Sequence, residues 1–105
     1  MENQHRKITG YRELSAEEID LMNRIKAKGA ELLALHAELV DQLRKYEVSL
    51  YNSIDNPNTP EENTAANHEF GRFRAAEPGR WASIGKTDIQ TGIMALVRAV
   101  AQPAV

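Results

Sequence analysis

Tyr11 and Lys26 are the residues of this chain whose types best fit the binding of a nucleotide. An aromatic ring can stack on a nucleobase, and a cation can donate charge-assisted hydrogen bonds to a phosphate. Arg12 follows Tyr11 directly, and Met22 and Asn23 stand four and three residues before Lys26. Residues at these two spacings share one face of a helix, so we expect a small binding cluster near a helix start.

A second group of candidate residues lies in the last third of the chain. Arg72, Arg74 and Arg80 surround a proline–glycine pair, and Thr87 follows within two helical turns. These residues could bind the phosphates of the same ligand. The alternative interpretation is that the lysines and arginines are solvated on exposed faces, where most charged residues lie, and that Tyr11 packs against a helix start. The residues alone leave both interpretations open.

The sequence lacks the residues that the common catalytic mechanisms need. It has no cysteine and no G-x-S-x-G, H-E-x-x-H, P-loop or G-x-G-x-x-G motif. His36 falls at an apolar repeat position, where a packed or hydrogen-bonded histidine is more common than a metal ligand. The acidic pairs Glu17–Glu18 and Glu61–Glu62 stand at predicted helix starts, where they complement the helix dipole. We therefore expect no enzyme, no cofactor and no metal site.

Composition restricts the partners further. The chain has 105 residues and a formal net charge of −2, which fits one domain and disfavours a duplex-DNA binder. Residues 1–28 carry six basic and five acidic side chains. Residues 29–67 carry two basic and seven acidic side chains, and residues 68–105 carry five basic and three acidic ones. If the mildly basic ends meet, they would suit a small anion. No run of 18 apolar residues and no secretory signal is present, so we expect no membrane partner.

A long predicted helix positions the first cluster. Ser15 and Glu18 form a capping-box pattern, and Leu14 and Ile19 occupy the positions of a hydrophobic staple. Residues then recur every seven positions in two mainly apolar series: Met22, Gly29, His36, Leu43 and Leu50, and Ile25, Leu32, Leu39 and Tyr46. This spacing predicts a helix over residues 16–51 that packs lengthwise against other helices. At ~1.5 Å per residue it would be about 54 Å long, so it must bend, break or project, and partner chains are expected.

The chain is then predicted to turn and return. Residues 52–59 are the predicted tip loop, and Thr59, Pro60 and Glu62 form a second helix start. The helix that follows should reach about Ala76 before the next proline interrupts it.

The last predicted helix completes a hairpin. Pro78–Gly79 should kink the returning helix, which continues over residues 80–101. The predicted fold is all-α: a single domain over residues 1–105, built as a long helical hairpin with kinked helices, with residues 1–14 as an N-terminal arm.

Three glycines lie within predicted helices: Gly29, Gly85 and Gly92. Each costs about 1 kcal/mol relative to alanine in a helix. We expect a close backbone approach, to another helix or to a ligand, to offset that cost.

Two stretches of the chain resemble a known family. Residues 10–15 (GYRELS) and 19–26 (IDLMNRIK) resemble the phage anti-CBASS sponge proteins of the second type. Residues 80–96 (RWASIGKTDIQTGIMAL) resemble the second core helix of that family and the related Thoeris anti-defence sponges. The resemblance covers about residues 7–50 and 78–101.

The resemblance implies a function. Family members bind and sequester cyclic di- and trinucleotide second messengers, such as cGAMP, without cleaving them, so that CBASS effectors are not activated. It implies a homohexamer in the cytoplasm of the infected bacterial host, with dinucleotide pockets between protomers and trinucleotide sites near three-fold axes. The base-stacking tyrosine and the lysine of the family fall on Tyr11 and Lys26. Which of Arg72, Arg74 and Arg80 serves which pocket stays open.

Two other functions stay open as well. The related sponges imply capture of a cyclic ADP-ribose signal of the Thoeris system. A helical oligomerisation or adaptor module with no small ligand would explain the heptad pattern equally well, and would leave Tyr11 and Lys26 without a role.

Overall fold

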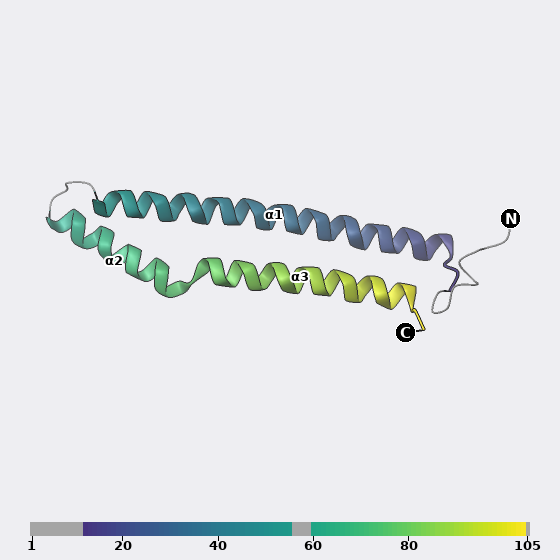
Figure 1. The fold of residues 1–105 in the computed structure, drawn as a ribbon. Coiled ribbons are helices and arrows are strands. Elements are labelled where there is room, and N and C mark those ends of the chain that lie inside the picture. Colours follow the sequence, from purple (N-terminus) through teal and green to yellow (C-terminus); the bar gives the residue numbers. More distant parts are fainter. Residues whose placement is uncertain (1–11, 56–59, 105) are drawn as a thin grey trace. The chain divides into compact units, whose positions relative to one another are not determined.

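The computed structural model describes residues 12–55 and 60–104, and these residues are almost entirely helical. In chain order the helices are α1 (Ala16–Asp55), α2 (Pro60–Ala76) and α3 (Pro78–Ala101) (Figure 1). No strand occurs among the described residues, so the predicted all-α class is confirmed. No helix in this part of the chain has the length and apolar character that a membrane span requires.

Helix α1 begins where the sequence predicts. Ser15 Oγ accepts a hydrogen bond from the Glu18 N–H at 3.1 Å, and Glu18 Oε1 accepts one from the Ser15 N–H at 2.8 Å. These reciprocal bonds satisfy donors that the first helical turn leaves without a partner, so the capping box is confirmed.

The other end of α1 differs from the prediction. The helix continues through residues 52–55, where the sequence analysis expects the start of the tip loop. Ser53 Oγ donates a hydrogen bond to Ser49 O at 3.0 Å, and Ile54 is half-buried. These contacts favour one more helical turn, and no proline precedes position 57 to stop it. The remainder of the predicted tip, residues 56–59, lies outside the described residues.

The junction between α2 and α3 is a single residue. α2 begins at Pro60 and ends at Ala76, as predicted. Glu77 has a φ of 50°, in the left-handed region, which turns the chain without a loop. α3 then begins at Pro78, two residues earlier than predicted, because proline is well suited to the first position of a helix. Gly79 therefore lies within the first turn of α3 and does not interrupt it.

The chain divides into two compact units. The first unit comprises residues 1–33 and 87–105, and the second comprises residues 34–86. Each unit contains part of α1 and part of the returning chain. The prediction of a single domain stays a prediction.

In the first unit, α1 and α3 meet closely at Gly29. A Cβ atom built on Gly29 would lie 2.2 Å from Cδ1 and 2.8 Å from Cγ1 of Ile93. The predicted close approach is therefore confirmed for this glycine. A Cβ atom on Gly85 or on Gly92 would meet no heavy atom within 4 Å, so the chain itself supplies no such neighbour for those two.

In the second unit, aromatic rings join α1 to α2. The rings of Tyr46 and Phe73 lie edge to face with centroids 5.4 Å apart, and Phe73 and Leu50 are buried. His36 Nε2 lies 2.9 Å from Ala82 O, to which it donates a hydrogen bond. This contact confirms the prediction that His36 is a hydrogen-bonded packing residue.

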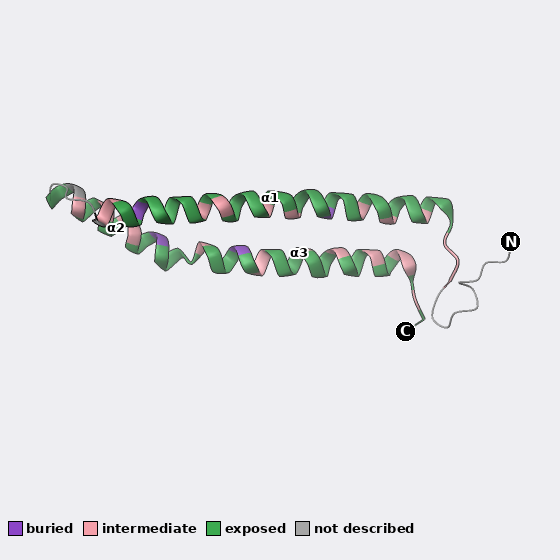
Figure 2. Cartoon of the chain, turned by 45° about the horizontal axis from the view of Figure 1, so that its top comes forward, coloured by how far each residue is buried: buried purple, intermediate pink, exposed green. Residues whose placement is uncertain are grey.

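Few side chains are shielded from solvent within one copy of the chain. Among the described residues, the buried hydrophobic side chains are Leu50, Phe73 and Ala82, each about 8% exposed, and none is below 2%. Exposed residues run along all three helices (Figure 2). A sequence that is 42% hydrophobic therefore leaves much of its apolar surface in contact with water.

Candidate ligand-binding site

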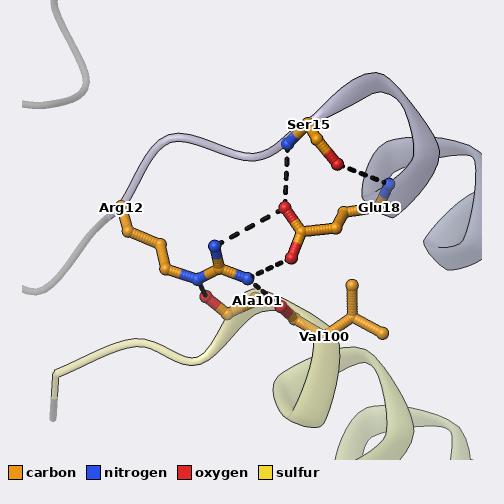
Figure 3. Close-up of polar contacts among 5 residues, drawn as sticks. All are labelled: Arg12, Ser15, Glu18, Val100 and Ala101. Carbon is orange, nitrogen blue, oxygen red and sulfur yellow. Dashed lines mark hydrogen bonds and ion pairs between the residues drawn. The ribbon is translucent and has the colours of Figure 1, made fainter.

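Arg12 is the first candidate residue in chain order that the structure describes, and its guanidinium group bonds to other residues of the chain. Tyr11 lies outside the described residues. The Arg12 guanidinium donates from Nε to Ala101 O at 3.1 Å and from Nη2 to Val100 O at 2.7 Å. The same group forms an ion pair with Glu18, with Nη2 2.5 Å from Oε2 (Figure 3). Arg12 thus binds the C-terminal carbonyl groups of α3, where a cation is favoured.

The contact between Arg12 and Glu18 has an electrostatic consequence. Hydrogen bonding from Arg12, followed by the backbone N–H of Ser15, lowers the pKa of Glu18 to about 2. Glu18 therefore stays ionised at pH values below 4.5, and its carboxylate holds the guanidinium in place. The capping box of α1 and the end of α3 are joined through this one arginine.

Lys26 differs from Arg12 in its surroundings. Its neighbours in α1 form ion pairs: Arg24 with Asp20 at 2.9 Å and Lys28 with Glu31 at 3.3 Å. Lys26 is exposed, and no acidic group among residues 12–55 and 60–104 pairs with it. Within the described part of the chain, its ammonium group is therefore available to bind an anion.

The sequence already contains a signal for this difference, which the analysis of motifs missed. Asp20 stands four residues before Arg24, and Glu31 stands three residues after Lys28, so both cations have an acidic neighbour on their own helix face. The positions three and four residues from Lys26 are occupied by neutral residues: Met22, Asn23, Gly29 and Ala30. A cation without an acidic neighbour at these spacings is a better anion-binding candidate than one with such a neighbour.

The other candidates near Lys26 differ in accessibility. Asn23 is exposed and Met22 is half-buried on α1, and Thr87 is exposed on α3. The first unit therefore contains Arg12, Met22, Asn23, Lys26 and Thr87 among the predicted site residues.

An apolar groove lies on another flank of α1. It has a volume of about 760 Å³ and lies between the first-unit parts of α1 and α3. Its apolar lining consists mainly of Leu21, Ile25, Leu32, Ile89, Ile93 and Leu96. At about 100° per residue, Lys26 is ~140° round the helix from Leu21 and ~120° from Leu32. Lys26 is not itself a lining residue of the groove, although Gly29, ~60° round the helix from it, is one.

Arg72, in the second unit, is bound within its own chain. Its Nε and Nη2 donate hydrogen bonds to the two carboxylate oxygens of Glu69, both at 2.7 Å. The hydroxyl of Tyr46 also donates to Glu69, at 2.5 Å. Hydrogen bonding from Arg72, then from Tyr46, lowers the pKa of Glu69 to about 2. The hydrogen bond to Glu69 in turn raises the pKa of Arg72. The spacing of three residues between Glu69 and Arg72 is a signal that the sequence analysis did not use.

Arg74 and Arg80, also in the second unit, stack on aromatic rings. The guanidinium carbon of Arg74 lies 5.6 Å from the centroid of the Phe70 ring, and that of Arg80 lies 5.1 Å from the Trp81 ring. Arg80 is also 3.9 Å from Glu77. Both guanidinium groups are exposed, so these cation–π contacts leave their hydrogen-bond donors accessible.

The described residues contain no arrangement for metal binding. No group of three His, Asp or Glu side chains in this part of the chain is placed to hold a metal ion. His36 is used in packing, and the acidic groups of Glu18 and Glu69 are used in ion pairs.

Comparison with known proteins places this chain among relatives. Residues 3–101 match the family described as "Acb2/Tad1, hairpin domain". Over 105 residues the chain is 59% identical to a protein named Anti-CBASS protein 2, from Pseudomonas phage JBD67, and the match covers 98% of this chain and 97% of that relative. Both matches extend through α1, α2 and α3 and confirm the resemblance found in the sequence. The chain therefore belongs to the Acb2/Tad1 hairpin-domain family.

Proposed function

We propose that this chain is a phage anti-defence protein that sequesters cyclic di- and trinucleotide second messengers, such as cGAMP. The messengers are bound and not cleaved, and CBASS effectors in the cytoplasm of the infected host are left without their activator. The 59% identity to Anti-CBASS protein 2 over nearly the full length of both chains carries this proposal. It is supported by Lys26, which is exposed and has no acidic partner among the described residues.

The binding roles follow from the chemistry of each group. Lys26 donates to a phosphate or to a base edge, where a charge-assisted hydrogen bond is stronger than a neutral one. Tyr11 stacks on a base, and Asn23 and Met22 contact the ligand beside Lys26. Sequestration requires affinity without turnover. A nanomolar dissociation constant corresponds to about 12 kcal/mol, which one lysine and one tyrosine do not supply. In this proposal, further groups from a neighbouring copy contribute to the affinity.

The functional particle in this proposal is a homo-oligomer, a hexamer by the resemblance. Its support is the apolar surface that one copy leaves exposed: Leu32 is 48% exposed, Leu35 58% and Met94 71%. A second copy of this chain is the occupant that we assign to the groove of the first unit. Leu21, Leu32 and Leu96 line that groove, and heptad-spaced helices pack lengthwise on one another.

Arg74 and Arg80 are the arginines best suited to a ligand in this proposal. Both are exposed, and Arg80 lies 3.9 Å from Glu77, beyond hydrogen-bond distance, whereas Arg12 and Arg72 donate hydrogen bonds to acceptors in the chain. Thr87 is exposed and contributes a hydroxyl.

The test is recovery of the ligand. The purified chain is incubated with cGAMP, separated from free ligand by gel filtration and heat-denatured, and the supernatant is analysed by mass spectrometry. We expect intact cGAMP to co-elute with the protein and to be released on denaturation. Elution of all the cGAMP as free ligand, or its recovery in cleaved form, would contradict the proposal.

A second candidate function is capture of a cyclic ADP-ribose signal of the Thoeris system. The observation in its favour is that the matching family description joins Acb2 with Tad1. Calorimetric titration of the same preparation with cGAMP and with a cyclic ADP-ribose separates the two. Heat of binding with the second compound alone would favour this candidate.

A further inference from the structure

The second unit contains a cavity that is lined by both apolar and charged residues. It has a volume of about 380 Å³, and all of its lining residues belong to that unit. Val40 and Leu43 of α1 and Phe73 of α2 form its apolar part. Ligand pockets measure about 300–1,000 Å³, so this cavity is large enough for part of a small ligand. Its polar residues decide which chemical group that part carries.

Two arginines line this cavity, and both have free hydrogen-bond donors. The Arg74 guanidinium has no acidic partner and no acceptor among residues 12–55 and 60–104. Arg44 donates from Nη2 to Asp41 at 2.8 Å, and its Nε and Nη1 groups have no acceptor in the same part of the chain. Ser83 is exposed and brings a hydroxyl group to the lining. An arginine fork binds two oxygens of a phosphate at once, so this set of donors suits a phosphate group.

Glu47 limits the negative charge that the cavity accepts. The charged lining residues are two arginines and this one glutamate, which leaves a formal charge of +1. A phosphate monoester carries about −1.5 to −2 at pH 7 and is repelled by a neighbouring carboxylate. A phosphodiester carries a single negative charge and matches the lining better. This is the linkage that cyclic di- and trinucleotides share.

Phe70 holds the guanidinium group of Arg74 before any ligand binds. The guanidinium carbon lies 5.6 Å from the centroid of the Phe70 ring. That ring is itself packed against α1, with its centroid 6.4 Å from that of Tyr51. A guanidinium that is stacked on a ring keeps its N–H donors accessible, and it loses less freedom on binding than a free one.

We infer that this cavity is a phosphodiester subsite for the messenger, with Arg74 as its main donor and Phe70 as the residue that positions Arg74. The inference rests on the proposed function. Arg44 and Ser83 donate to the same linkage, and Glu47 disfavours a second negative charge. A cavity of about 380 Å³ accommodates one linkage with its adjoining sugar, and the rest of the ligand extends beyond it.

Substitutions of opposite sign test the subsite. Calorimetry gives the dissociation constants for cGAMP and for cyclic tri-AMP in the wild type, Arg74→Gln and Glu47→Gln. Lys86→Gln is the matched control, because it removes a positive charge from an exposed residue of the same unit that does not line the cavity. We expect Arg74→Gln to weaken the binding of at least one messenger about tenfold or more. Glu47→Gln should tighten the binding of that messenger about two- to threefold, and Lys86→Gln should change it less than about twofold.

The two messengers distinguish the possible sources of the linkage. A loss for cGAMP alone or for cyclic tri-AMP alone identifies the ligand that occupies the subsite. Wild-type affinity of Arg74→Gln for both would overturn the inference, as would an equal loss in Lys86→Gln or the absence of tighter binding in Glu47→Gln. Failure of the wild type to bind either messenger would instead remove the proposed function.

A double-mutant cycle tests the positioning role of Phe70. Phe70→Leu removes the ring under the guanidinium and keeps an apolar side chain. It should weaken binding of the same messenger about threefold in the wild-type background and have no effect in the Arg74→Gln background. An equal loss in both backgrounds would mean that Phe70 acts on the fold and not through Arg74, and would overturn this part of the inference.

Discussion

Gly29 of α1 lies directly against Ile93 of α3, with no room for a β-carbon between them. A Cβ atom at position 29 would be 2.2 Å from Cδ1 and 2.8 Å from Cγ1 of Ile93. Gly29 is also an a-type position of the heptad series, so the glycine permits the two helices of the first unit to approach along the predicted packing face.

We predict that Gly29→Ala destabilises the protein. Alanine favours the helix by about 1 kcal/mol, but overpacking at a close contact costs about 1–3 kcal/mol. The overpacking cost should exceed the gain in helix stability, because two atoms of Ile93 must move to make room for the new methyl group. Thermal unfolding should show a lower midpoint, and Ile93→Val, which removes Cδ1, should restore part of the loss in the double variant.

Gly92→Ala is the matched control for this prediction. A Cβ atom at Gly92 meets nothing within 4 Å, so the helix gain should appear without a clash and raise the midpoint. A lower midpoint for Gly92→Ala, combined with a smaller particle in solution, would show that a neighbouring copy packs against this glycine. An unchanged midpoint for Gly29→Ala would contradict the close approach in α1 and α3.

Acid should destabilise the fold through Glu18 and Glu69. The pKa of each is lowered from 4.5 to about 2 in the folded chain, chiefly by hydrogen bonds from Arg12 and Arg72. Because the folded pKa lies below the unfolded one, the stabilisation is complete above about pH 4.5 and is lost as the pH falls toward 2. The unfolding midpoint should therefore decline across this range. Glu69→Gln should make the decline shallower, whereas Glu38→Gln, a substitution at an exposed glutamate of α1, should leave it as in the wild type.

Local spacing explains which parts of the fold could be predicted. Ser15 and Glu18 are three residues apart, and Pro60 acts within its own turn, so both helix starts can be read from neighbouring residues. Glu77 could not be anticipated in the same way. Its left-handed backbone joins two packed helices, and a glutamate carries no local preference for that conformation.

In the candidate site, too, features set by neighbouring residues could be predicted from the sequence, and features set by packing between helices could not. The free charge of Lys26 is visible in the sequence, because no acidic residue stands three or four positions away. The engagement of Arg12 is not, because its acceptors, Val100 O and Ala101 O, are backbone groups more than 85 residues distant. A contact of that kind depends on how α1 and α3 meet, and no local pattern encodes it.

Substitution of Lys26 should weaken ligand binding without affecting the fold. We predict that Lys26→Ala raises the dissociation constant for cyclic dinucleotides about tenfold or more, since a charge-assisted hydrogen bond to the ligand is lost. Tyr11→Ala should have an effect of at least this size through the loss of base stacking. Calorimetry measures both, and light scattering should show an unchanged particle mass.

Lys45→Ala is the control for the loss of charge. Lys45 pairs with Asp41 at 2.9 Å in the second unit and has no role in the proposed site. The Lys45→Ala variant should bind cyclic dinucleotides with the affinity of the wild type. Wild-type affinity in both Lys26→Ala and Tyr11→Ala would refute the assignment of these residues and favour a helical module with no small ligand.

A charge placed in the apolar groove should dissociate the oligomer. Leu32 lines the groove and is 48% exposed in a single copy, so it can be changed without opening a cavity in the chain itself. In the oligomer that we propose, an aspartate at this position would be buried against a second copy without a partner, and an unpaired buried charge is strongly unfavourable. Leu32→Asp should therefore elute as a smaller particle with its helix content retained in circular dichroism. Gln42→Asp adds the same charge at an exposed polar position and should keep the wild-type mass. A wild-type mass for Leu32→Asp would exclude this groove as the contact between copies, and a monomeric wild type would also remove the shared pocket on which tight binding of the messenger depends.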